Sequence, residues 1–494
     1  MWPTLIAVFA ATLSLLECSP AGVNAAEGGF VDPAPPEVHD AQSGAAAVLS
    51  ENPRTSFHGK PKSLPDGAVT SDWANFLGPS RNMVSPETNL LKKLGPGAPT
   101  LLWEMQKGTS YSSPAIAGDR LLYLHRDEGE ERVVSLDPET GKLFWEFSYP
   151  TDFSDRYGYN NGPRSTPLID GDRVYTYGAK GQLHSLDVAT GRVVWKRDLA
   201  REFKVPQDFF GNAQTPLLEN DRLIINVGAP GGPTVAAFDK TTGRMLWGAG
   251  TEWGPSYASP VAATVHGKRR VFVFAGGESR PATGGLLSID PANGKIDFAF
   301  PWRSRTVESV NAATPVVIGD KVLVSATYRT GAALVQVKPD FTHEVLWTSD
   351  DLDLHWTTAI EHEGYIYAFA GRNEPDAGLI CVDLKTGKTV WREVLEWQEK
   401  VELNGQTREV YESPYRGFIM KVDGRFLALG EHGHLMWLDL SPQGGKIASR
   451  STLFLARESW SPPVLSRGLL YVTQNTKSFD GQPPRLLCYD FRQQ

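Results

Sequence analysis

The sequence predicts an all-β protein, an eight-bladed β-propeller of four-stranded antiparallel blades. Three observations predict this fold. A motif of about 50 residues recurs eight times from residue 72 onward, each copy carries the signals of four strands, and the two ends of the chain hold complementary parts of one copy. Repetition at such a period is typical of propellers and other repeat proteins.

The clearest part of each copy is a strand, a tight turn and a second strand. In residues 183–197, LHSLDVATGRVVWKR, alternating apolar residues lead to Asp187, Thr190-Gly191-Arg192 provides the turn, and Trp195 lies on the next strand. An aromatic ring once per copy predicts docking between adjacent blades. The position of Asp187 recurs as Asp137, Asp187, Asp239, Asp290, Lys338, Asp383, Asp439 and Asp490.

An earlier strand of each copy follows a second repeated feature, a Ser or Thr that precedes Pro or, once, Ala. We expect these strands to be innermost and to surround the central channel. The pairs are Ser113-Pro114, Thr166-Pro167, Thr215-Pro216, Ser259-Pro260, Thr314-Pro315, Thr358-Ala359, Ser413-Pro414 and Ser461-Pro462.

The ends of the chain predict how the ring closes. The eighth copy stops shortly after Asp490, so it lacks an outer strand and a docking Trp. Residues 101–104, with Trp103, form a Trp-bearing strand that has no preceding copy of the Asp motif. We therefore expect an N-terminal strand to complete the last blade, which protects the ring from exposed sheet edges.

The residues before the repeats predict export. Residues 5–16 are an apolar run too short to span a bilayer and typical of a signal peptide, so we expect a signal peptide over 1–25 and a periplasmic or secreted protein. A lipoprotein signal ending at Cys18 is an alternative, although Glu17 stands where a small residue is expected. Residues 26–71 are expected to be a disordered linker, and residues 72–494 the propeller.

Composition excludes several classes of protein. The formal charge is −8, and no basic run exceeds Lys268-Arg269-Arg270, which argues against nucleic-acid binding. Three Cys cannot build a disulfide framework. No segment reaches the length of uninterrupted apolar residues that a membrane span needs, and we expect a monomer.

The repeat, carried by Ser185, Asp187, Thr190, Gly191, Arg192 and Trp195, resembles the pyrroloquinoline-quinone (PQQ) type propeller repeat. The resemblance covers residues 73–494, and the opening residues 73–81 resemble PQQ-like repeat proteins of the planctomycete kind. Two relatives imply opposite functions. The quinoprotein alcohol dehydrogenases bind PQQ with Ca²⁺ on the propeller axis, whereas the barrel-assembly lipoprotein of the outer membrane is a cofactor-free scaffold.

The chain departs from the dehydrogenase pattern. It has neither the vicinal Cys-Cys pair nor a C-x-x-C-H haem motif, and no motif identifies the Glu, Asn and Asp that hold calcium. We therefore expect no cofactor, with PQQ and Ca²⁺ as the alternative. In that alternative the quinone lies over Trp356 or Trp460, Arg164 lies near its carbonyl oxygens, and Asn311 and Glu308 help to hold Ca²⁺.

Candidate binding residues precede the innermost strands. Aromatic faces mixed with Arg, Asn and Glu at one mouth suit a flat, polar ligand, although such residues also fill a propeller mouth with structure and water. Residues 157–164 and 328–331 are candidate binding loops, and the insertion 395–411 is either a partner-binding arm or a solvated loop. The candidate residues are Tyr111, Arg164, Asn212, Tyr257, Asn311, Trp356, Glu412 and Trp460.

Two other groups of residues have plain structural interpretations. Cys381 and Cys488 stand where other copies have small residues, so we expect buried, inert thiols that are too far apart for a disulfide. His432 and His434 have the spacing of two imidazoles on one face of a strand, but no carboxylate or Cys pattern accompanies them, so no metal site is assigned.

Two functional hypotheses follow. The first is an exported, non-catalytic binding or scaffold protein that presents its loops to protein partners in the cell envelope, with room for a small polar ligand in the funnel. The second is a quinoprotein oxidoreductase that acts on alcohols or sugars. The fold does not distinguish them, because propellers host both enzymes and scaffolds.

Overall fold

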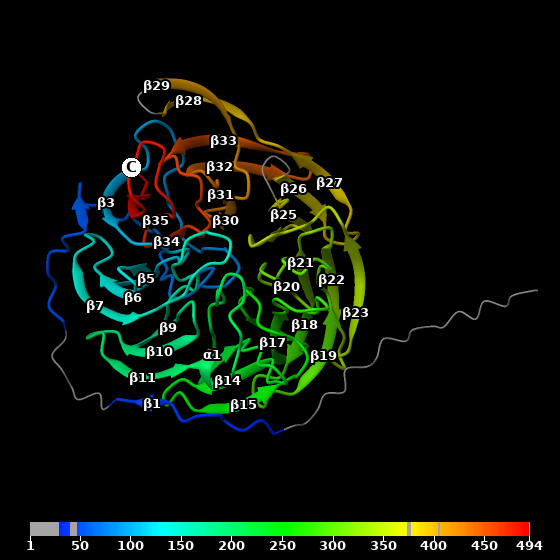
Figure 1. Ribbon diagram of the computed structural model, residues 1–494. Coiled ribbons are helices and arrows are strands. Elements are labelled where there is room, and N and C mark those ends of the chain that lie inside the picture. Colours follow the sequence, from blue (N-terminus) through cyan, green and yellow to red (C-terminus); the bar gives the residue numbers. More distant parts are fainter. Residues whose placement is uncertain (1–28, 40–46, 373–376, 404–405, 494) are drawn as a thin grey trace, which may run out of the picture.

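A computed structural model of the protein describes residues 29–39, 47–372, 377–403 and 406–493. Eight four-stranded antiparallel sheets stand in a ring, as Figure 1 shows. The predicted eight-bladed propeller is confirmed. Each sheet is a blade, and in blades 1 to 7 the strands follow one another in chain order from the axis outward.

The blades consist of the following strands. Blade 1 contains β4 (Ala115–Ala117), β5 (Arg120–Asp127), β6 (Glu130–Leu136) and β7 (Leu143–Pro150); blade 2, β8 (Leu168–Asp170), β9 (Arg173–Tyr177), β10 (Gln182–Asp187) and β11 (Val193–Asp198); blade 3, β12 (Leu217–Glu219), β13 (Arg222–Ile225), β14 (Val235–Asp239) and β15 (Met245–Ala249); blade 4, β16 (Val261–Val265), β17 (Lys268–Ala275), β18 (Gly285–Ile289) and β19 (Ile296–Pro301).

Blade 5 contains β20 (Val316–Ile318), β21 (Lys321–Ala326), β22 (Gly331–Val337) and β23 (His343–Ser349); blade 6, β24 (Ile360–His362), β25 (Tyr365–Ala370), β26 (Gly378–Asp383) and β27 (Thr389–Glu393); blade 7, β30 (Phe418–Val422), β31 (Arg425–Leu429), β32 (His434–Ser441) and β33 (Gly444–Thr452); blade 8, β34 (Val464–Ser466), β35 (Leu469–Gln474), β36 (Arg485–Asp490) and β3 (Thr100–Gln106). Outside the blades lie β1 (Glu37–Val38), β2 (Thr55–Phe57), α1 (Leu199–Glu202), β28 (Trp397–Leu403) and β29 (Gln406–Glu412).

The repeated turn between the third and fourth strands is locked by its own residues. The carboxylate of Asp187 accepts hydrogen bonds from the backbone nitrogen and the hydroxyl of Thr190, at 2.9 and 2.7 Å. Gly191 then takes a φ of +73°, a conformation that glycine adopts without a steric penalty. The sequence Asp-x-x-Thr-Gly therefore returns the chain to the outer strand.

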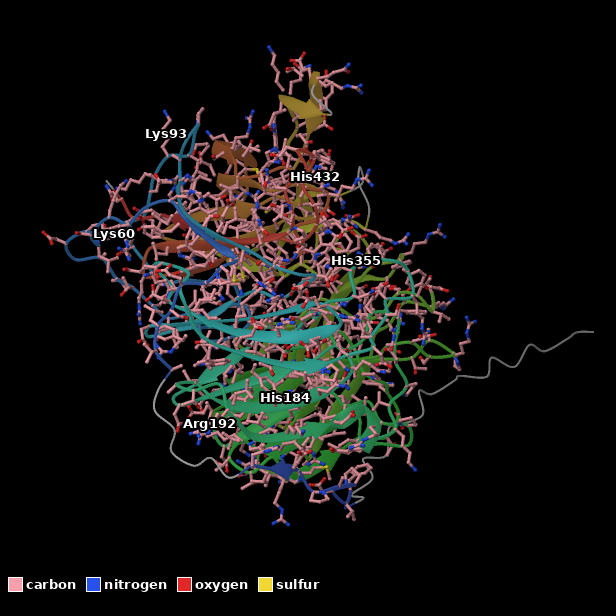
Figure 2. All side chains as sticks on the ribbon, turned by 60° about the vertical axis from the view of Figure 1, so that its left-hand side comes forward. Lys60, Lys93, His184, Arg192, His355 and His432 are labelled. Atoms are coloured by element: carbon pink, nitrogen blue, oxygen red, sulfur yellow. The ribbon has the colours of Figure 1, made fainter. Side chains whose placement is uncertain are left out.

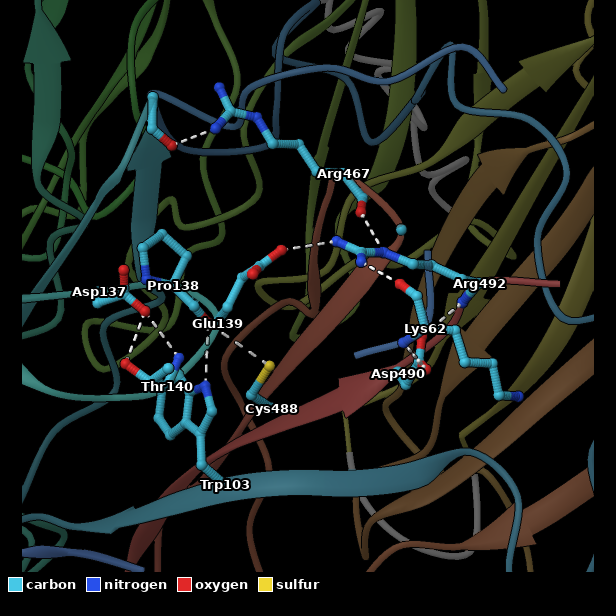
Figure 3. Close-up of polar contacts among 12 residues, drawn as sticks. Lys62, Trp103, Asp137, Pro138, Glu139, Thr140, Arg467, Cys488, Asp490 and Arg492 are labelled. Carbon is cyan, nitrogen blue, oxygen red and sulfur yellow. Dashed lines mark hydrogen bonds and ion pairs between the residues drawn. The ribbon is translucent and has the colours of Figure 1, made fainter. Parts of the chain in front are cut away.

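The recurring ring docks most blades on the next, as the sequence predicts. The Trp145 indole lies so close to Gly191 of blade 2 that a Cβ on this glycine would come within 2.5 Å of the ring. Its Nε1 donates a hydrogen bond to the Val188 carbonyl at 2.8 Å. The contact repeats at blade 8, where Trp103 donates to the Pro138 carbonyl at 2.9 Å (Figure 3).

The chain ends close the ring in blade 8. Strand β3 pairs antiparallel with β36, with Leu101 opposite Tyr489 and Trp103 opposite Cys488. The predicted N-terminal strand is thus the outer strand of the last blade. Closure of this kind leaves no open sheet edge between the first and last blades.

The hydrophobic core lies between neighbouring sheets. One cluster joins Leu217, Ile224 and Trp247 of blade 3 to Val271 and Leu287 of blade 4. Both faces of a blade therefore bury apolar side chains, which leaves the loops and the outer edges for contacts with other molecules. Among the described residues, no helix is long and apolar enough to cross a bilayer.

The N-terminal residues differ from the expectation of a disordered linker over 26–71. Residues 29–39 and 47–71 lie along the outside of the ring, where β1 pairs with β11 and β2 pairs with β3. The contacts that order this stretch come from distant parts of the chain, so its own composition does not reveal them. The predicted signal peptide and Cys18 fall among residues 1–28, outside the described residues.

The insertion at 395–411 forms a hairpin of β28 and β29, with Trp397 opposite Glu412. The hairpin projects beyond the ring at the top of Figure 2. Its base is fixed by Glu399, which receives hydrogen bonds from Thr452 and Trp397 at 2.6 and 2.9 Å and pairs with Nε2 of His434 at 2.8 Å. The insertion is thus an ordered hairpin, and whether it binds a partner stays a prediction.

Candidate functional site

A cavity of about 230 Å³ opens on the propeller axis and receives side chains from all eight blades. In each blade, the loop that enters the first strand and the loop between the second and third strands lie at the same end, because the strands are antiparallel. These two kinds of loop build most of the cavity wall, to which Phe76 is added from the segment ahead of β3. Its charged and aromatic residues are Phe76, Tyr111, Tyr159, Arg164, Phe210, Tyr257, Glu308, Tyr328, His355, Trp356, Arg372, Arg416, Phe418 and Trp460.

The structure brings five of the eight candidate residues together in this wall: Tyr111, Arg164, Tyr257, Trp356 and Trp460. The calcium candidate Glu308 also lines the cavity. The Ser/Thr-Pro step is the pattern that identifies these residues. The residues just before it lie in the loop that leads from the mouth of the cavity into the innermost strand.

The other three candidates do not line the cavity. Asn311 is buried, and its amide nitrogen donates to the carbonyls of Ala275 and Trp302 at 2.8 and 3.1 Å. Asn212 accepts a hydrogen bond from the Tyr177 hydroxyl at 3.2 Å, beside a separate pocket. These two amides hold loops in place.

Glu412, the third of these, lies at the end of β29 and pairs with Nδ1 of His432 at 2.9 Å. His434 pairs instead with Glu399. The two imidazoles of the H-x-H motif therefore contact different carboxylates. Cys381 and Cys488 are free and buried, as the sequence predicts.

The aromatic side chains of the wall touch in one continuous series. Tyr257 contacts Phe210, which contacts Tyr159, with ring centres 5.5 and 5.8 Å apart. Tyr159 lies 5.4 Å from Trp460, which lies 4.7 Å from Trp356. His355 continues the series between Trp356 and Tyr328, at 4.5 and 6.1 Å. The mouth is therefore a connected aromatic surface drawn from six loops.

Buried carboxylates hold this surface from behind. Glu431 forms an ion pair with Arg416, with 2.9 Å between Nε and Oε2, and accepts a hydrogen bond from Trp460 Nε1 at 2.6 Å. The Arg416 guanidinium lies over both Trp356 and Trp460, 4.8 and 5.3 Å from their ring centres. One carboxylate thus positions two of the candidate residues, through a charge-assisted network.

Two further pairs complete the support. Tyr111 stacks on Trp460 and donates a hydrogen bond to Glu458 at 2.6 Å. Burial raises the pKa of both the Tyr111 phenol and the Glu458 carboxyl. Arg164 pairs with the buried Asp155 at 2.6 Å. These carboxylates are all engaged by a neighbouring cation or phenol.

Two buried ring nitrogens of the cavity wall have no protein partner. Nδ1 of His355 and Nε1 of Trp356 are buried and have no hydrogen-bond partner. Burial, together with the charges of Arg416 and Arg372, lowers the pKa of His355 to about 3, so its imidazole is neutral at physiological pH. Arg372 lies over the Tyr328 ring at 3.9 Å and has no ion pair among the described residues. Cationic and donor groups thus dominate the wall.

Sequence reasoning missed Arg372, Arg416 and Phe210. Arg372 comes from the loop between the second and third strands of blade 6, and Tyr328 from the same loop of blade 5. The candidate residues come from the entry loops of the first strands, where Phe210 and Arg416 also lie, and the one candidate loop between second and third strands was 328–331. The Gly-Arg step at Gly371 after β25 is the signal that could have located this second set.

Several residues named for a quinone and calcium already contact other side chains in or behind the cavity wall. Tyr111 and Arg416 already lie against the rings on which a quinone would stack. Glu431 and Glu458 are engaged by Arg416 and Tyr111, and the Asn311 amide nitrogen donates to backbone carbonyls, whereas its buried oxygen has no hydrogen-bond partner. Across the described ranges, no three His, Cys, Asp or Glu side chains converge in a group that could hold a metal ion.

An eight-bladed ring of Asp-x-x-Thr-Gly repeats, docked by Trp around an axial cavity, defines a PQQ-like propeller. The chain belongs to the family described as outer membrane protein assembly factor BamB, which matches residues 129–393, more than half of its length. The resemblance stated from the sequence is therefore confirmed at the level of the family.

Individual relatives include enzymes and an assembly factor. The chain is 25% identical over 385 residues to the dehydrogenase subunit of alcohol dehydrogenase (quinone) from Gluconobacter oxydans (strain 621H), covering 68% of this chain and 48% of that protein. It is 26% identical over 197 residues to outer membrane protein assembly factor BamB from Burkholderia pseudomallei (strain K96243), covering 39% and 43%. The chain thus spans about half the length of these relatives or less.

Among solved structures, the quinohemoprotein alcohol dehydrogenase from Comamonas testosteroni aligns with a TM-score of 0.58 at 14% identity. The alignment covers 86% of this chain and 81% of that one. Similarity at this level of identity supports the fold alone. The relatives include both functional classes, so the choice between them depends on the site.

Proposed function

We propose that the protein is a non-catalytic binding protein of the cell envelope and that the aromatic mouth of the axial cavity is its contact surface for protein partners. The observation that carries this proposal is the connected series from Tyr257 to Tyr328, bordered by Arg372 and Arg416. Tyr, Trp and Arg are the residues that dominate the binding energy of protein interfaces. The excess of cations and donors favours a partner segment that brings a carboxylate together with an apolar side chain.

A photo-cross-linking residue at position 159 tests this proposal in cells that export the chain. Tyr159 lines the cavity and keeps 43% of its surface exposed. The matched control is position 390 on the outer edge of blade 6, where Val390 is 42% exposed. We expect a discrete protein adduct from position 159 and none from position 390.

The substitution Arg372→Glu should remove the adduct, because it reverses the charge at the rim without touching the buried pair of Arg416 and Glu431. The absence of any adduct from position 159, or an adduct that Arg372→Glu leaves unchanged, would contradict the proposal.

A quinone dehydrogenase is the second candidate, favoured by the similarity over 68% of the chain to the Gluconobacter subunit. It is tested by adding PQQ and Ca²⁺ to the purified chain and following the absorbance spectrum and dye reduction with alcohols and aldose sugars. We expect neither a spectral change nor turnover. Turnover that requires both additions would establish the enzyme and overturn the binding proposal.

A further inference from the structure

Residues 29–39 lie across the outer edges of blades 2 and 3 in the manner of a bound peptide (Figure 1). From residue 30 to residue 37 the exposure of their side chains alternates. Those of Phe30, Asp32, Ala34 and Pro36 are partly buried, whereas the residues between them are exposed. A period of two is that of an extended segment with one face against a surface. We call residues 29–39 the arm.

Asp32 is the polar anchor of the arm. Its two carboxylate oxygens face Nη2 and Nη1 of Arg197 at 2.5 and 3.1 Å, and Oδ2 also accepts a hydrogen bond from the backbone nitrogen of Met245 at 2.8 Å. Burial by itself would raise the pKa of Asp32, but the hydrogen bonds and the charge of Arg197 hold it below its usual value. Fork-shaped pairing of this kind is both strong and geometrically specific.

The receptor for this carboxylate is built without the arm. With the arm in place the Arg197 side chain is 0% exposed, and, apart from its bonds to the arm, its Nε donates to Glu202 at 2.8 Å and Nη1 donates to the Gly243 carbonyl at 2.9 Å. The guanidinium also lies 4.9 Å from the ring centre of Phe238. None of these contacts involves residues 29–39, so the guanidinium stays oriented when the arm leaves. Such preorganisation lowers the cost of binding.

Glycines make room for the apolar residues of the arm. A Cβ on Gly232 would lie 2.8 Å from the Phe30 ring, and one on Gly248 would lie 3.0 Å from Phe30 Cβ. A Cβ on Gly243 would lie 3.2 Å from Pro36. The surface is therefore shaped for Phe two residues before the Asp and for Pro four residues after it.

The arm is held at few points. Its β-ladder consists of Glu37 and Val38 opposite Lys196 and Trp195, extended by a hydrogen bond from the backbone nitrogen of His39 to the Val194 carbonyl at 3.0 Å. Val31 is 84% exposed, and no residue of the arm belongs to the clusters that form the described core. Its prolines favour an extended conformation in the free state, which lowers the entropy lost on binding.

We propose that the outer edges of blades 2 and 3 form a binding site for an extended acidic peptide with Phe two residues before Asp, and that the arm occupies this site as an exchangeable ligand. This inference concerns a different face of the propeller from the axial mouth and does not depend on the proposed function. Recognition combines strand addition with a buried carboxylate site.

The test uses a fluorescent peptide with the sequence of residues 29–39 and the full chain, with binding followed by anisotropy. In the double variant Phe30→Ala, Asp32→Asn the arm is weakened, so the site should be free to take the peptide. We expect the double variant to bind the peptide at least about tenfold more tightly than the unmodified chain, in which the arm competes. A peptide with Asp32→Asn should bind the double variant about tenfold more weakly, which isolates the carboxylate without altering the protein.

Melting temperatures show whether the double variant stays folded, and the single variant Asp32→Asn replaces it if the double variant melts early. Arg197→Lys in the double-variant background should reduce peptide binding, because a lysine keeps the charge and loses the fork. If the folded double variant, or Asp32→Asn in its place, does not bind the peptide or binds both peptides equally, the proposal is overturned. The arm is then a fixed part of the propeller.

Discussion

The indole of Trp145 lies flat against Gly191, the turn glycine of the next blade, and the contact recurs around the ring. Gly243 meets Trp195, Gly294 meets Trp247 and Gly387 meets Trp347 in the same way. The turn glycine therefore has two roles, because it takes a positive φ and it leaves space for the neighbouring ring. These roles can be separated by experiment.

Gly191→Ala should destabilise the protein more than Gly118→Ala. Both glycines have a positive φ, +73° and +58°, so each substitution costs about 1 kcal/mol of backbone strain. Only at position 191 would the new methyl meet a ring, whereas nothing lies within 4 Å at position 118. We expect a further loss of about 1–3 kcal/mol at position 191, seen as a lower urea midpoint. Equal losses would show that the ring contact contributes nothing beyond the turn.

Glu431→Gln should weaken the wall of the cavity. The substitution removes the charge that holds Arg416 and Trp460, and loss of one partner of a buried pair typically costs about 3–5 kcal/mol. The matched control is Glu139→Gln, which breaks the pair of the exposed Glu139 carboxylate with Arg492 at 3.0 Å. It should cost at most about 1 kcal/mol, because Arg492 keeps its hydrogen bonds to the carbonyls of Lys62 and Arg467. Urea unfolding of the two variants gives the comparison, and similar midpoints would contradict a supporting role for Glu431.

His184 should make the protein less stable as the pH falls. Burial and the positive charge of Lys196 lower its pKa from about 6.5 to about 3, so the unfolded chain binds a proton that the folded chain rejects. Its contribution is therefore fully present above about pH 6.5 and is lost between about pH 6.5 and 3, at about 1.4 kcal/mol per pH unit. His184→Gln should flatten the pH dependence of the melting temperature in this window, and an unchanged slope would refute the assignment.

Glu399→Gln should release the hairpin of β28 and β29 without unfolding the ring. Burial by itself would raise the pKa of Glu399, but hydrogen bonds from His434, Thr452 and Trp397 lower it to about 2. Loss of the charge weakens these bonds, so we expect faster amide exchange over the hairpin at an unchanged melting temperature. Glu409→Gln, on the exposed side of the same hairpin, is the control and should leave exchange unchanged.

The fold could be predicted because the same motif occurs in eight copies along the sequence. Asp187, Gly191 and Trp195 occupy equivalent positions in most copies, so weak copies such as that around Lys338 could be placed by spacing. The ring closure followed because Trp103 and Asp490 are halves of one motif. Periodic patterns of this kind need no knowledge of distant contacts.

The candidate site could be predicted only in part. Residues that enter the innermost strands follow the repeat, and Tyr111, Trp356 and Trp460 were found in this way. Asn311 also precedes an innermost strand, but its amide nitrogen donates to the Ala275 carbonyl. The spacing of residues along the sequence does not determine the direction in which a side chain points. Arg372 lies in a loop that the repeat does not conserve in length or composition, so no periodic signal indicates it.

The N-terminal arm could not be predicted, because every contact that orders it lies far away in the sequence. Asp32 meets Arg197 and Met245, and composition reports only that the segment is rich in proline. The same prolines that argue against helix and sheet keep the segment extended for its surface.

The pairing of β3 with β36 also sets the order in which the molecule can be completed. Residues 100–106 leave the ribosome early, and their partner strand 485–490 is made only after seven blades have followed. Until then β3 is paired with β2 on one edge, and its other edge, which will take β36, has no partner strand. An interruption of synthesis or a proteolytic cut ahead of Arg485 would therefore leave a gap at blade 8 of an otherwise assembled ring. Loss of the last strand alone would also weaken the contact between β3 and the first blade.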